Sequence, residues 1–137
     1  LWPNILLECR RRGIPTVGWM TPILPWLTDT EENVRGILDR CVDAGVKGIV
    51  CFNMGMTLRE GNREYYYAAL DRHFPGLSDR YRRHFGNAYN VLSPNSAALM
   101  RLFRETCERY GILHEPEDCF RCIAELPERQ VQVSLFD

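Results

Sequence analysis

The sequence predicts an α/β protein built around a βαβ unit. Two short apolar runs, residues 14–20 and 48–52, have the length of strands. Between them, the apolar residues of 31–44 recur at helical spacing. A strand, a helix and a strand within about 35 residues indicate parallel strands joined by a crossover helix. Because both runs are continuously apolar, we expect the sheet to be covered on both faces, as in α/β barrels and doubly wound sheets.

Capping and breaking residues define the neighbouring elements. A short N-terminal helix is expected to end at Gly13. The proline-punctuated stretch 21–27 is expected to be a loop, since proline restricts its own backbone and that of the preceding residue. Thr28 and Glu31 have capping-box spacing at the start of the crossover helix, and Gly45 is expected to end that helix with a left-handed backbone.

The second part of the chain reads as a mainly helical extension. Residues 87–92 are expected to be irregular, whereas the alternation of polar and apolar residues over 130–136 predicts a terminal strand. The sequence therefore divides into a late βαβ part, residues 1–58, and an extension, residues 59–137. Helices of the extension, each bounded by proline, glycine or a capping serine such as Ser93, are expected at 62–73, 78–85, 93–110 and 116–126.

Composition and charge exclude several classes of protein. The chain has 137 residues, of which 45% are hydrophobic and 26% charged, so it is not a disordered chain. Its net charge of −1 provides no general attraction to nucleic acids or membranes. No apolar run has the length of a membrane span, and no signal segment is recognisable, so we expect a cytoplasmic location. The first residue, Leu1, is not methionine, which leaves a processed or partial chain open.

Six cysteines are interpreted as free thiols rather than as a disulfide framework. Only Cys119 and Cys122 form a C-x-x-C pair, and no second pair completes a zinc site. Cys107 could add a third thiolate for an iron–sulfur cluster. However, Cys119 lies on the apolar stripe of a predicted helix, which favours packing over metal or redox chemistry. We therefore predict no metal ligand among these residues.

Ligands of parallel α/β proteins bind at the carboxyl ends of the strands. Here these ends are residues 20–25 and 53–59. Arg59 and Arg63 are four residues apart, so both could face one site at the start of the following helix. The alternative is that both arginines pair with neighbouring glutamates, and the spacing alone favours this alternative.

A second candidate is the run of arginine, histidine and aromatic residues over 72–85. Basic side chains interleaved with aromatic rings suit a phosphate backbone beside stacked bases. Yet residues 59–86 hold six arginines against four acidic residues, which favours a solvated helix face. The remaining hypothesis for this run is a non-catalytic module that binds nucleic acid or assembles with a partner.

Several segments together resemble a known family. The sequence is similar to the late barrel segment of radical S-adenosylmethionine proteins, in the branch related to spore photoproduct lyase and DNA repair photolyases. The most specific match is Gly55–Tyr65. The other positions that carry the resemblance are Thr21–Pro25, Asp29–Asn33, Ala44–Ile49, Phe74–Leu77, Tyr81, Gly86–Tyr89 and Val133–Phe136.

This resemblance implies the C-terminal part of a partial (β/α) TIM-like barrel. In the family, a C-x-x-x-C-x-x-C motif holds a [4Fe-4S] cluster that cleaves S-adenosylmethionine to a 5′-deoxyadenosyl radical. The present sequence lacks that motif, so we expect the cluster ligands upstream of Leu1 and a fragment that is inactive alone. Such a motif upstream would favour the enzyme over the binding module. DNA repair is suggested by the branch, while the substrate itself is left open.

The resemblance also implies roles for individual residues. Ile23 and Leu24 would lie near the adenine, and Asn53 would lie near the cofactor at the next strand end. The residues implied at the substrate side of the barrel mouth are Arg59, Glu60 and Arg63.

Two parallel strands alone do not form a stable sheet, and their edges favour association. We therefore expect a partner, either the missing N-terminal half of the barrel or a second copy of the chain. Nucleic acid stays open as a further partner, and no membrane contact is expected.

Overall fold

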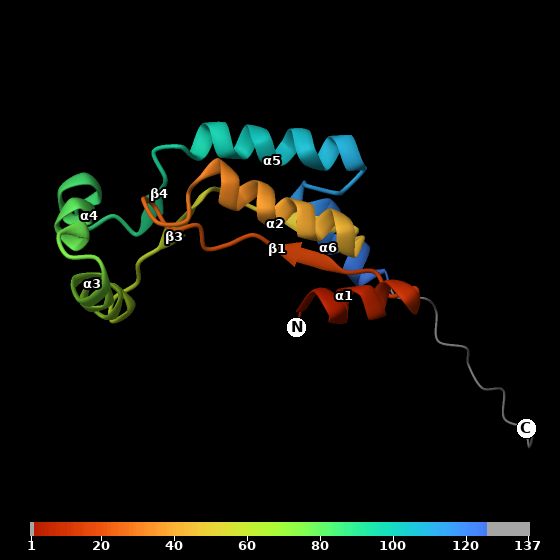
Figure 1. Cartoon of the computed structure of the whole chain (residues 1–137), viewed down its shortest axis with the longest axis horizontal. Helices are drawn as coiled ribbons and strands as arrows, with labels where there is room; N and C mark the ends of the chain where they lie inside the picture. Colours follow the sequence, from red (N-terminus) through yellow and green to blue (C-terminus); the bar gives the residue numbers. More distant parts are fainter. Residues whose placement is uncertain (1, 126–137) are drawn as a thin grey trace, which may run out of the picture.

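The computed structural model describes residues 2–125 of the chain and confirms a mixed α/β fold. The strands form two separate two-stranded sheets, β1 with β2 in parallel and β3 with β4 antiparallel. The elements follow one another in the order α1 (Trp2–Arg11), β1 (Val17–Trp19), α2 (Glu31–Ala44), β2 (Gly48–Val50), β3 (Gly55–Thr57), α3 (Asn62–His73), α4 (Leu77–Phe85), β4 (Asn90–Leu92), α5 (Ser96–Tyr110) and α6 (Pro116–Ala124) (Figure 1).

The predicted βαβ unit is confirmed by β1, α2 and β2. Gly45 ends α2 with a φ of 69°, as expected from the sequence. The predicted capping residue is wrong, because the hydroxyl of Thr30 accepts the hydrogen bond from the backbone N–H of Asn33, at 3.2 Å. The hydroxyl of Thr28 instead accepts from the backbone N–H of Leu24, at 2.7 Å, and so closes the preceding loop.

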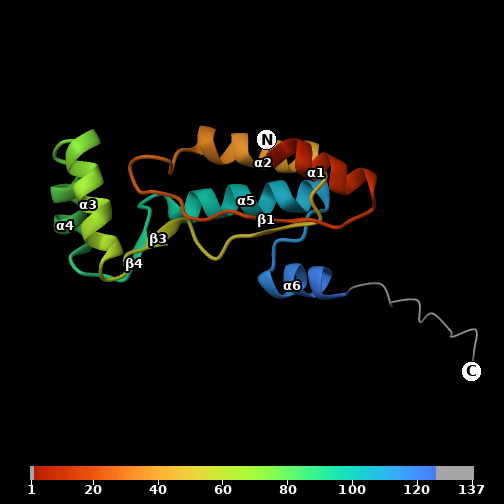
Figure 2. The same cartoon turned by 90° about the horizontal axis from the view of Figure 1, so that it is seen from below.

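Helices lie on both sides of the parallel strands, and the predicted coverage of both faces is confirmed for β2, whose three residues are buried. It is wrong for β1, where Val17 and Gly18 are half-buried and Trp19 is exposed. Figure 2 shows α1 and α2 on one side of β1 and α6 on the other. On the first side, a Cβ added to Gly18 would lie 3.7 Å from Sγ of Cys41 in α2. On the other side, a Cβ added to Gly48 would lie 2.8 Å from Sγ of Cys119 in α6. The absence of a side chain at Gly48 therefore allows α6 to approach β2 closely.

The main hydrophobic core joins the two parts of the sequence. Leu38 of α2 and Ile49 of β2 pack in the same cluster as Leu99 and Phe103 of α5. The long helix of the extension thus covers the crossover helix of the βαβ unit. The predicted division of the chain into residues 1–58 and 59–137 stays a prediction. Residues from both parts pack together in this core.

A buried hydrogen bond fixes the starts of α2 and α5 to each other. The hydroxyl of Ser93 donates to Oδ2 of Asp29 at 2.5 Å, and both residues are buried. Ser93 also accepts from the backbone N–H of Asn95 at 3.0 Å. The prediction that Ser93 caps α5 is therefore wrong, because its hydroxyl is used in this contact and Asn95 occupies the capping position.

A second, smaller core lies among α3, α4 and β4. Its buried members are Leu58, Tyr67, Leu70, Tyr81 and Val91. The expectation of an irregular segment at 87–92 is wrong, since β4 pairs with β3 over Asn90–Leu92. Three residues are too few to show a strand pattern in the sequence. The segment is a strand because it pairs with β3, which is distant in the sequence.

Two further expectations concern the ends of the chain and membranes. The terminal strand predicted at 130–136 lies outside the described residues. Across residues 2–125, the helices are too short or too polar to traverse a lipid bilayer.

Candidate functional site

A groove lies at the carboxyl ends of the two parallel strands, where ligands bind in parallel α/β proteins. Its volume is about 330 Å³, which is at the small end of the range for ligand pockets. Eight residues line it, and they come from the segments that follow β1 and β2, from β3 itself and from the start of α3: Thr21, Pro22, Phe52, Asn53, Gly55, Met56, Thr57 and Asn62.

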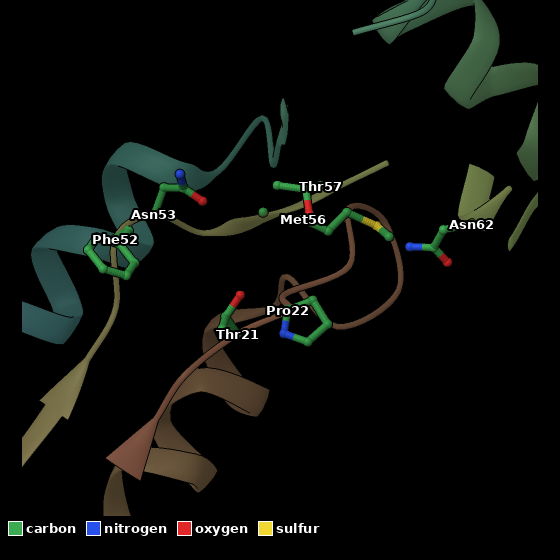
Figure 3. A pocket seen from close by; sticks show the side chains of 8 residues that line it. Thr21, Pro22, Phe52, Asn53, Met56, Thr57 and Asn62 are labelled. Atoms are coloured by element: carbon green, nitrogen blue, oxygen red, sulfur yellow. The ribbon is translucent and has the colours of Figure 1, made fainter. Parts of the chain in front are cut away.

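The groove forms where the segment that follows β1 folds back across the ends of the strands. Thr21 follows β1, and Phe52 and Asn53 follow β2 (Figure 3). The segment after β1 is fixed to β3 because the backbone N–H of Ile23 donates to the carbonyl of Gly55 at 3.0 Å. In Figure 3, Phe52 lies at one end of the groove and Asn62 at the other.

The lining of the groove combines polar and apolar groups and carries no ionisable side chain. The amides of Asn53 and Asn62 can each donate and accept hydrogen bonds, and the hydroxyls of Thr21 and Thr57 can do the same. All four residues are exposed, so these groups are accessible to a ligand. Phe52 adds an exposed aromatic ring. This arrangement suits binding of an uncharged ring with polar edges and offers no side chain for general acid–base catalysis.

The structure places one of the predicted cofactor residues in the groove. Asn53 lines it directly. Ile23 is buried in the main core, and its contribution to the groove is the backbone hydrogen bond to Gly55. Leu24 is half-buried and does not line the groove. Of the two positions predicted beside an adenine, neither lines the groove, and only Ile23 is joined to a lining residue by a hydrogen bond.

The three predicted substrate-side residues lie outside the groove lining. Nε of Arg59 donates to the hydroxyl of Tyr89 at 3.1 Å. Glu60 is exposed in the loop that follows β3. Asn62, which sequence reasoning missed, is the residue of this segment that does line the groove.

Arg63 has a role that its position in the sequence does not reveal. Its guanidinium donates to the carbonyls of Leu58, Asn87 and Ala88, at 3.1, 3.2 and 2.9 Å. A weaker contact of 3.4 Å reaches the carbonyl of Gly86. Arg63 thus fastens the turn between α4 and β4 to the end of β3, which differs from the expected pairing with a glutamate.

The basic and aromatic run is largely carried by α4. The Arg80 guanidinium lies 4.2 Å from the ring centre of Trp26, and Arg82 lies 4.8 Å from that of Tyr67. Arg82 also forms an ion pair with Asp79 at 3.1 Å. Arg80 and Arg83 are exposed. Part of the run therefore contributes to packing, and part of it forms a basic surface.

All six cysteines are free thiols, and four of them are buried. Burial raises the pKa of Cys51 to about 11 and that of Cys107 to about 12, because a thiolate is poorly solvated in the core. The Cys119 thiol contacts the carbonyl of Leu113 at 3.4 Å. Within the described part of the chain, no three His, Cys, Asp or Glu side chains are grouped as a metal site.

Alkylation with iodoacetamide at about pH 8 is expected to separate two classes of cysteine, because only the exposed thiolate reacts. Cys9 and Cys122 are half-buried and should be labelled in the folded protein, whereas Cys51 and Cys107 should be labelled only after unfolding in urea. Peptide mass spectrometry measures both rates. Equal labelling of Cys107 and Cys122 in the folded protein would contradict the packing described here.

Comparison with known proteins identifies relatives but no family. The chain is 32% identical over 78 residues to uncharacterized proteins of Mycobacterium tuberculosis (strain H37Rv) and Mycobacterium bovis. The match covers 57% of this chain and 22% of each relative, so the chain corresponds to a small part of those proteins. No family model matches the chain. No solved structure matches it either.

Proposed function

We propose that the chain forms the nucleoside-binding edge of a radical S-adenosylmethionine enzyme, as the C-terminal part of a partial (β/α) barrel. The observation that carries the proposal is an uncharged groove of mixed polar and apolar lining at the carboxyl ends of two parallel strands. S-adenosylmethionine contains adenine and ribose but no phosphate. A site for its nucleoside end therefore needs amides, hydroxyls and an aromatic surface rather than arginine or lysine.

The groove residues have distinct roles in this proposal. Asn53 and Asn62 present amides, which can pair with the polar edge of an adenine. Thr21 and Thr57 present hydroxyls suited to ribose, and the Phe52 ring offers a stacking surface. Ile23 holds β3 in place through its backbone, and Arg63 holds the loop beyond β3. In this proposal, both are positioning residues.

The cysteines of residues 2–125 do not fit an iron–sulfur cluster, because no three of them are grouped as ligands. When bound, such a cluster supplies the electron that cleaves the sulfonium of S-adenosylmethionine. The proposal assigns the cluster ligands and the remaining barrel strands to a segment other than these residues. The chain alone is then inactive. The whole protein is a cytoplasmic enzyme of lyase type, and damaged DNA is one candidate for the substrate of that enzyme.

Binding of S-adenosylhomocysteine to the isolated chain tests the proposal. We expect shifts of the backbone amide signals of Thr21, Asn53 and Asn62 in ¹H–¹⁵N NMR spectra, with a weak dissociation constant because only one edge of the site is present. Adenosine monophosphate should bind less well, since the groove has no cation for its phosphate. Asn53→Ala should weaken S-adenosylhomocysteine binding about fivefold or more, as expected for the loss of a hydrogen bond.

A matched substitution controls for general effects of removing an amide. Asn4 lies exposed in α1, away from the groove lining, and Asn4→Ala should leave the affinity unchanged. If S-adenosylhomocysteine causes no shifts at millimolar concentration, or if its shifts are unaffected by Asn53→Ala, the groove is not its site. Tighter binding of adenosine monophosphate would equally count against the proposal.

A second function, a nucleic-acid-binding module, is favoured by the basic surface of α4. The Arg80 guanidinium lies over Trp26, and the exposed Arg72 and Arg83 lie in the same helical pair. Arginines beside aromatic rings suit single-stranded nucleic acid. Residues Asp71 and Asp79 reduce this positive charge, so the groove proposal is preferred.

Fluorescence anisotropy with labelled oligo-dT tests this second function. Binding should weaken steeply as salt is raised, because counterions are released from the phosphates. Combined Arg80→Glu and Arg83→Glu should abolish it, while Arg101→Glu with Arg109→Glu on α5 changes the net charge equally and should have a smaller effect. Equal losses in both double variants would indicate a general charge effect instead of a site on α4.

A further inference from the structure

A further groove lies at the amino ends of the two parallel strands, opposite the groove lined by Asn53. Its volume is about 550 Å³, which is within the range for small-molecule sites. Its lining includes Arg10 from the last turn of α1, Lys47 just before β2, and Tyr110 at the end of α5. Figures 1 and 2 show the C-terminal ends of α1, α2 and α5 at the end of the molecule farthest from α3 and α4. The two grooves are therefore separate sites.

The charge of this groove is basic. Its lining carries the side chains of Arg10 and Lys47 and no carboxylate. Arg11 and Arg12, the next residues of α1, both pair with Glu8, at 3.8 and 2.8 Å. Within residues 2–125, neither Arg10 nor Lys47 takes part in an ion pair. Both side chains are exposed, so their charges are available to an anion.

Gly45 allows the Arg10 side chain to lie across the end of α2. A Cβ added to Gly45 would lie 2.8 Å from Cδ of Arg10, 2.9 Å from its Nε and 3.0 Å from its Cζ. The guanidinium reaches the backbone carbonyl of Asp43 through a long contact of 3.5 Å. Because a guanidinium has five N–H donors, this contact leaves others for a ligand. Arg10 is thus held at the groove in a position to bind an anion.

The helix ends account for only part of this basic charge. Carbonyls at the C-terminal end of a helix favour nearby cations. Here, however, backbone N–H groups already satisfy such carbonyls. Gly13 donates to Arg10 at 3.1 Å, and Gly45 donates to Val42 at 3.0 Å. The basic side chains are therefore not needed as hydrogen-bond partners for these carbonyls.

The lining also contains exposed apolar surface beside the charges. Tyr110 is 54% exposed and Ile14 is 51% exposed. An aromatic ring such as that of Tyr110 packs well against a second ring. The groove therefore combines two basic groups with a surface for a planar, apolar group.

We propose that this groove binds a small organic phosphate that carries a planar ring. The phosphate lies between Arg10 and Lys47, and the ring lies against Tyr110. Arginine binds phosphate through paired N–H donors, and lysine binds it as a point charge. Two basic groups suit a single phosphate, whereas a nucleic acid strand needs a longer row of cations. The site is independent of the proposed nucleoside site.

The single lysine of the chain gives a direct readout of binding. Lys47 is the only lysine in the sequence, so protein labelled with ¹³C at lysine Cε gives one lysine side-chain signal in NMR spectra. Titration with phenyl phosphate should shift this signal and the backbone amide signals of Gly45 and Gly111. The signals of Thr21 and Asn53 should stay in place, so a ligand of this groove is distinguished from a ligand of the nucleoside site.

Related probes separate the contribution of the ring from that of the charge. Phenyl phosphate should bind about fivefold more tightly than inorganic phosphate, because its ring contacts Tyr110. Phenol, which lacks the charge, should leave the Lys47 signal unshifted at the same concentration. Tyr110→Ser should reduce the affinity for phenyl phosphate to that for inorganic phosphate. Equal affinities of the parent chain for the two phosphates would overturn the assignment to a phosphate with a ring.

Removal of single charges tests the basic pair. Arg10→Gln and Lys47→Gln, the latter followed by the amide signals of Gly45 and Gly111, should each weaken phenyl phosphate binding about tenfold. Arg11→Gln removes the same charge one residue along α1, where the arginine pairs with Glu8, and should change the affinity less than about twofold.

Urea unfolding of each variant shows whether a loss of binding reflects a loss of the fold. The proposal is overturned if phenyl phosphate at millimolar concentration leaves the Lys47 signal of the folded parent chain in place. It is also overturned if Arg11→Gln weakens binding as much as Arg10→Gln does. Variants at Arg10 and Lys47 that lose stability but keep their affinity would show that these side chains only balance the helix ends, which equally contradicts the proposal.

Discussion

Gly55→Ala is expected to destabilise the protein by about 3 kcal/mol or more, through overpacking and the loss of strand pairing. A Cβ at this position would lie 2.2 Å from the carbonyl oxygen of Val91 and 3.0 Å from Cα of Leu92. Both neighbours are backbone atoms of β4, so no side-chain rotation can relieve the contact. The two strands must separate, and the hydrogen bond from Ile23 to the Gly55 carbonyl is then disturbed as well.

Urea unfolding followed by circular dichroism measures this effect, and a second glycine serves as its control. Gly36 lies exposed within α2, with no neighbouring atom within 4 Å of an added Cβ. Gly36→Ala should therefore stabilise the protein by about 0.5–1 kcal/mol, because alanine favours a helix over glycine. If Gly55→Ala unfolds at the same urea concentration as the parent, the close approach of β3 and β4 is wrong.

Tyr81→Ala is the second substitution with a large expected effect, about 3–5 kcal/mol as for other large buried aromatic residues. Tyr81 is fully buried at the centre of the smaller core. Its hydroxyl donates to the carbonyl of Pro25 at 2.7 Å and lies 3.0 Å from the hydroxyl of Tyr66. The ring also packs 5.2 Å from that of Trp26. Its loss would detach α4 from the loop that follows β1.

Tyr81→Phe separates the contribution of the hydroxyl from that of the ring. It should cost about 1–2 kcal/mol, because the Pro25 carbonyl loses its donor. Burial raises the pKa of Tyr81, so the folded protein keeps the phenol protonated while the unfolded chain ionises near pH 10. Stability should therefore fall as pH rises above about 10, and Tyr81→Phe should reduce this fall. Tyr65→Ala, at an exposed position, should change stability by less than about 0.5 kcal/mol.

The elements predicted correctly from the sequence are those whose own residues show a periodic apolar pattern or a residue that ends a helix. The apolar spacing of α2 and the glycine that ends it identified the crossover helix and, with it, the parallel strands. By contrast, β4 has no such signal, because its strand character depends on Gly55 and the rest of β3. The caps at Thr28 and Ser93 were misassigned because both hydroxyls form other hydrogen bonds. Thr28 accepts from Leu24 in the preceding loop, and Ser93 donates to Asp29 at the start of α2.

The same distinction applies to the groove. The rule that ligands bind at strand ends located Asn53 from the sequence alone. Thr21 likewise lies in the predicted strand end 20–25, whereas Asn62 was missed, since only the fold of the chain brings the start of α3 beside Asn53. For Arg63, the residue spacing favoured a glutamate partner and the family resemblance implied the substrate side. Its actual partners are backbone carbonyls, which no pattern of residue types reveals.

The shared core has a consequence for any attempt to divide this polypeptide. Cutting the chain near residue 58 would separate Leu99 and Phe103 from the crossover helix. Each piece would then expose hydrophobic surface that is buried in the whole chain. Neither piece should then persist as a folded unit. Mixed together, the two pieces should reassemble, so this point of the backbone is suited to a split-protein design in which each half becomes ordered only in the presence of the other.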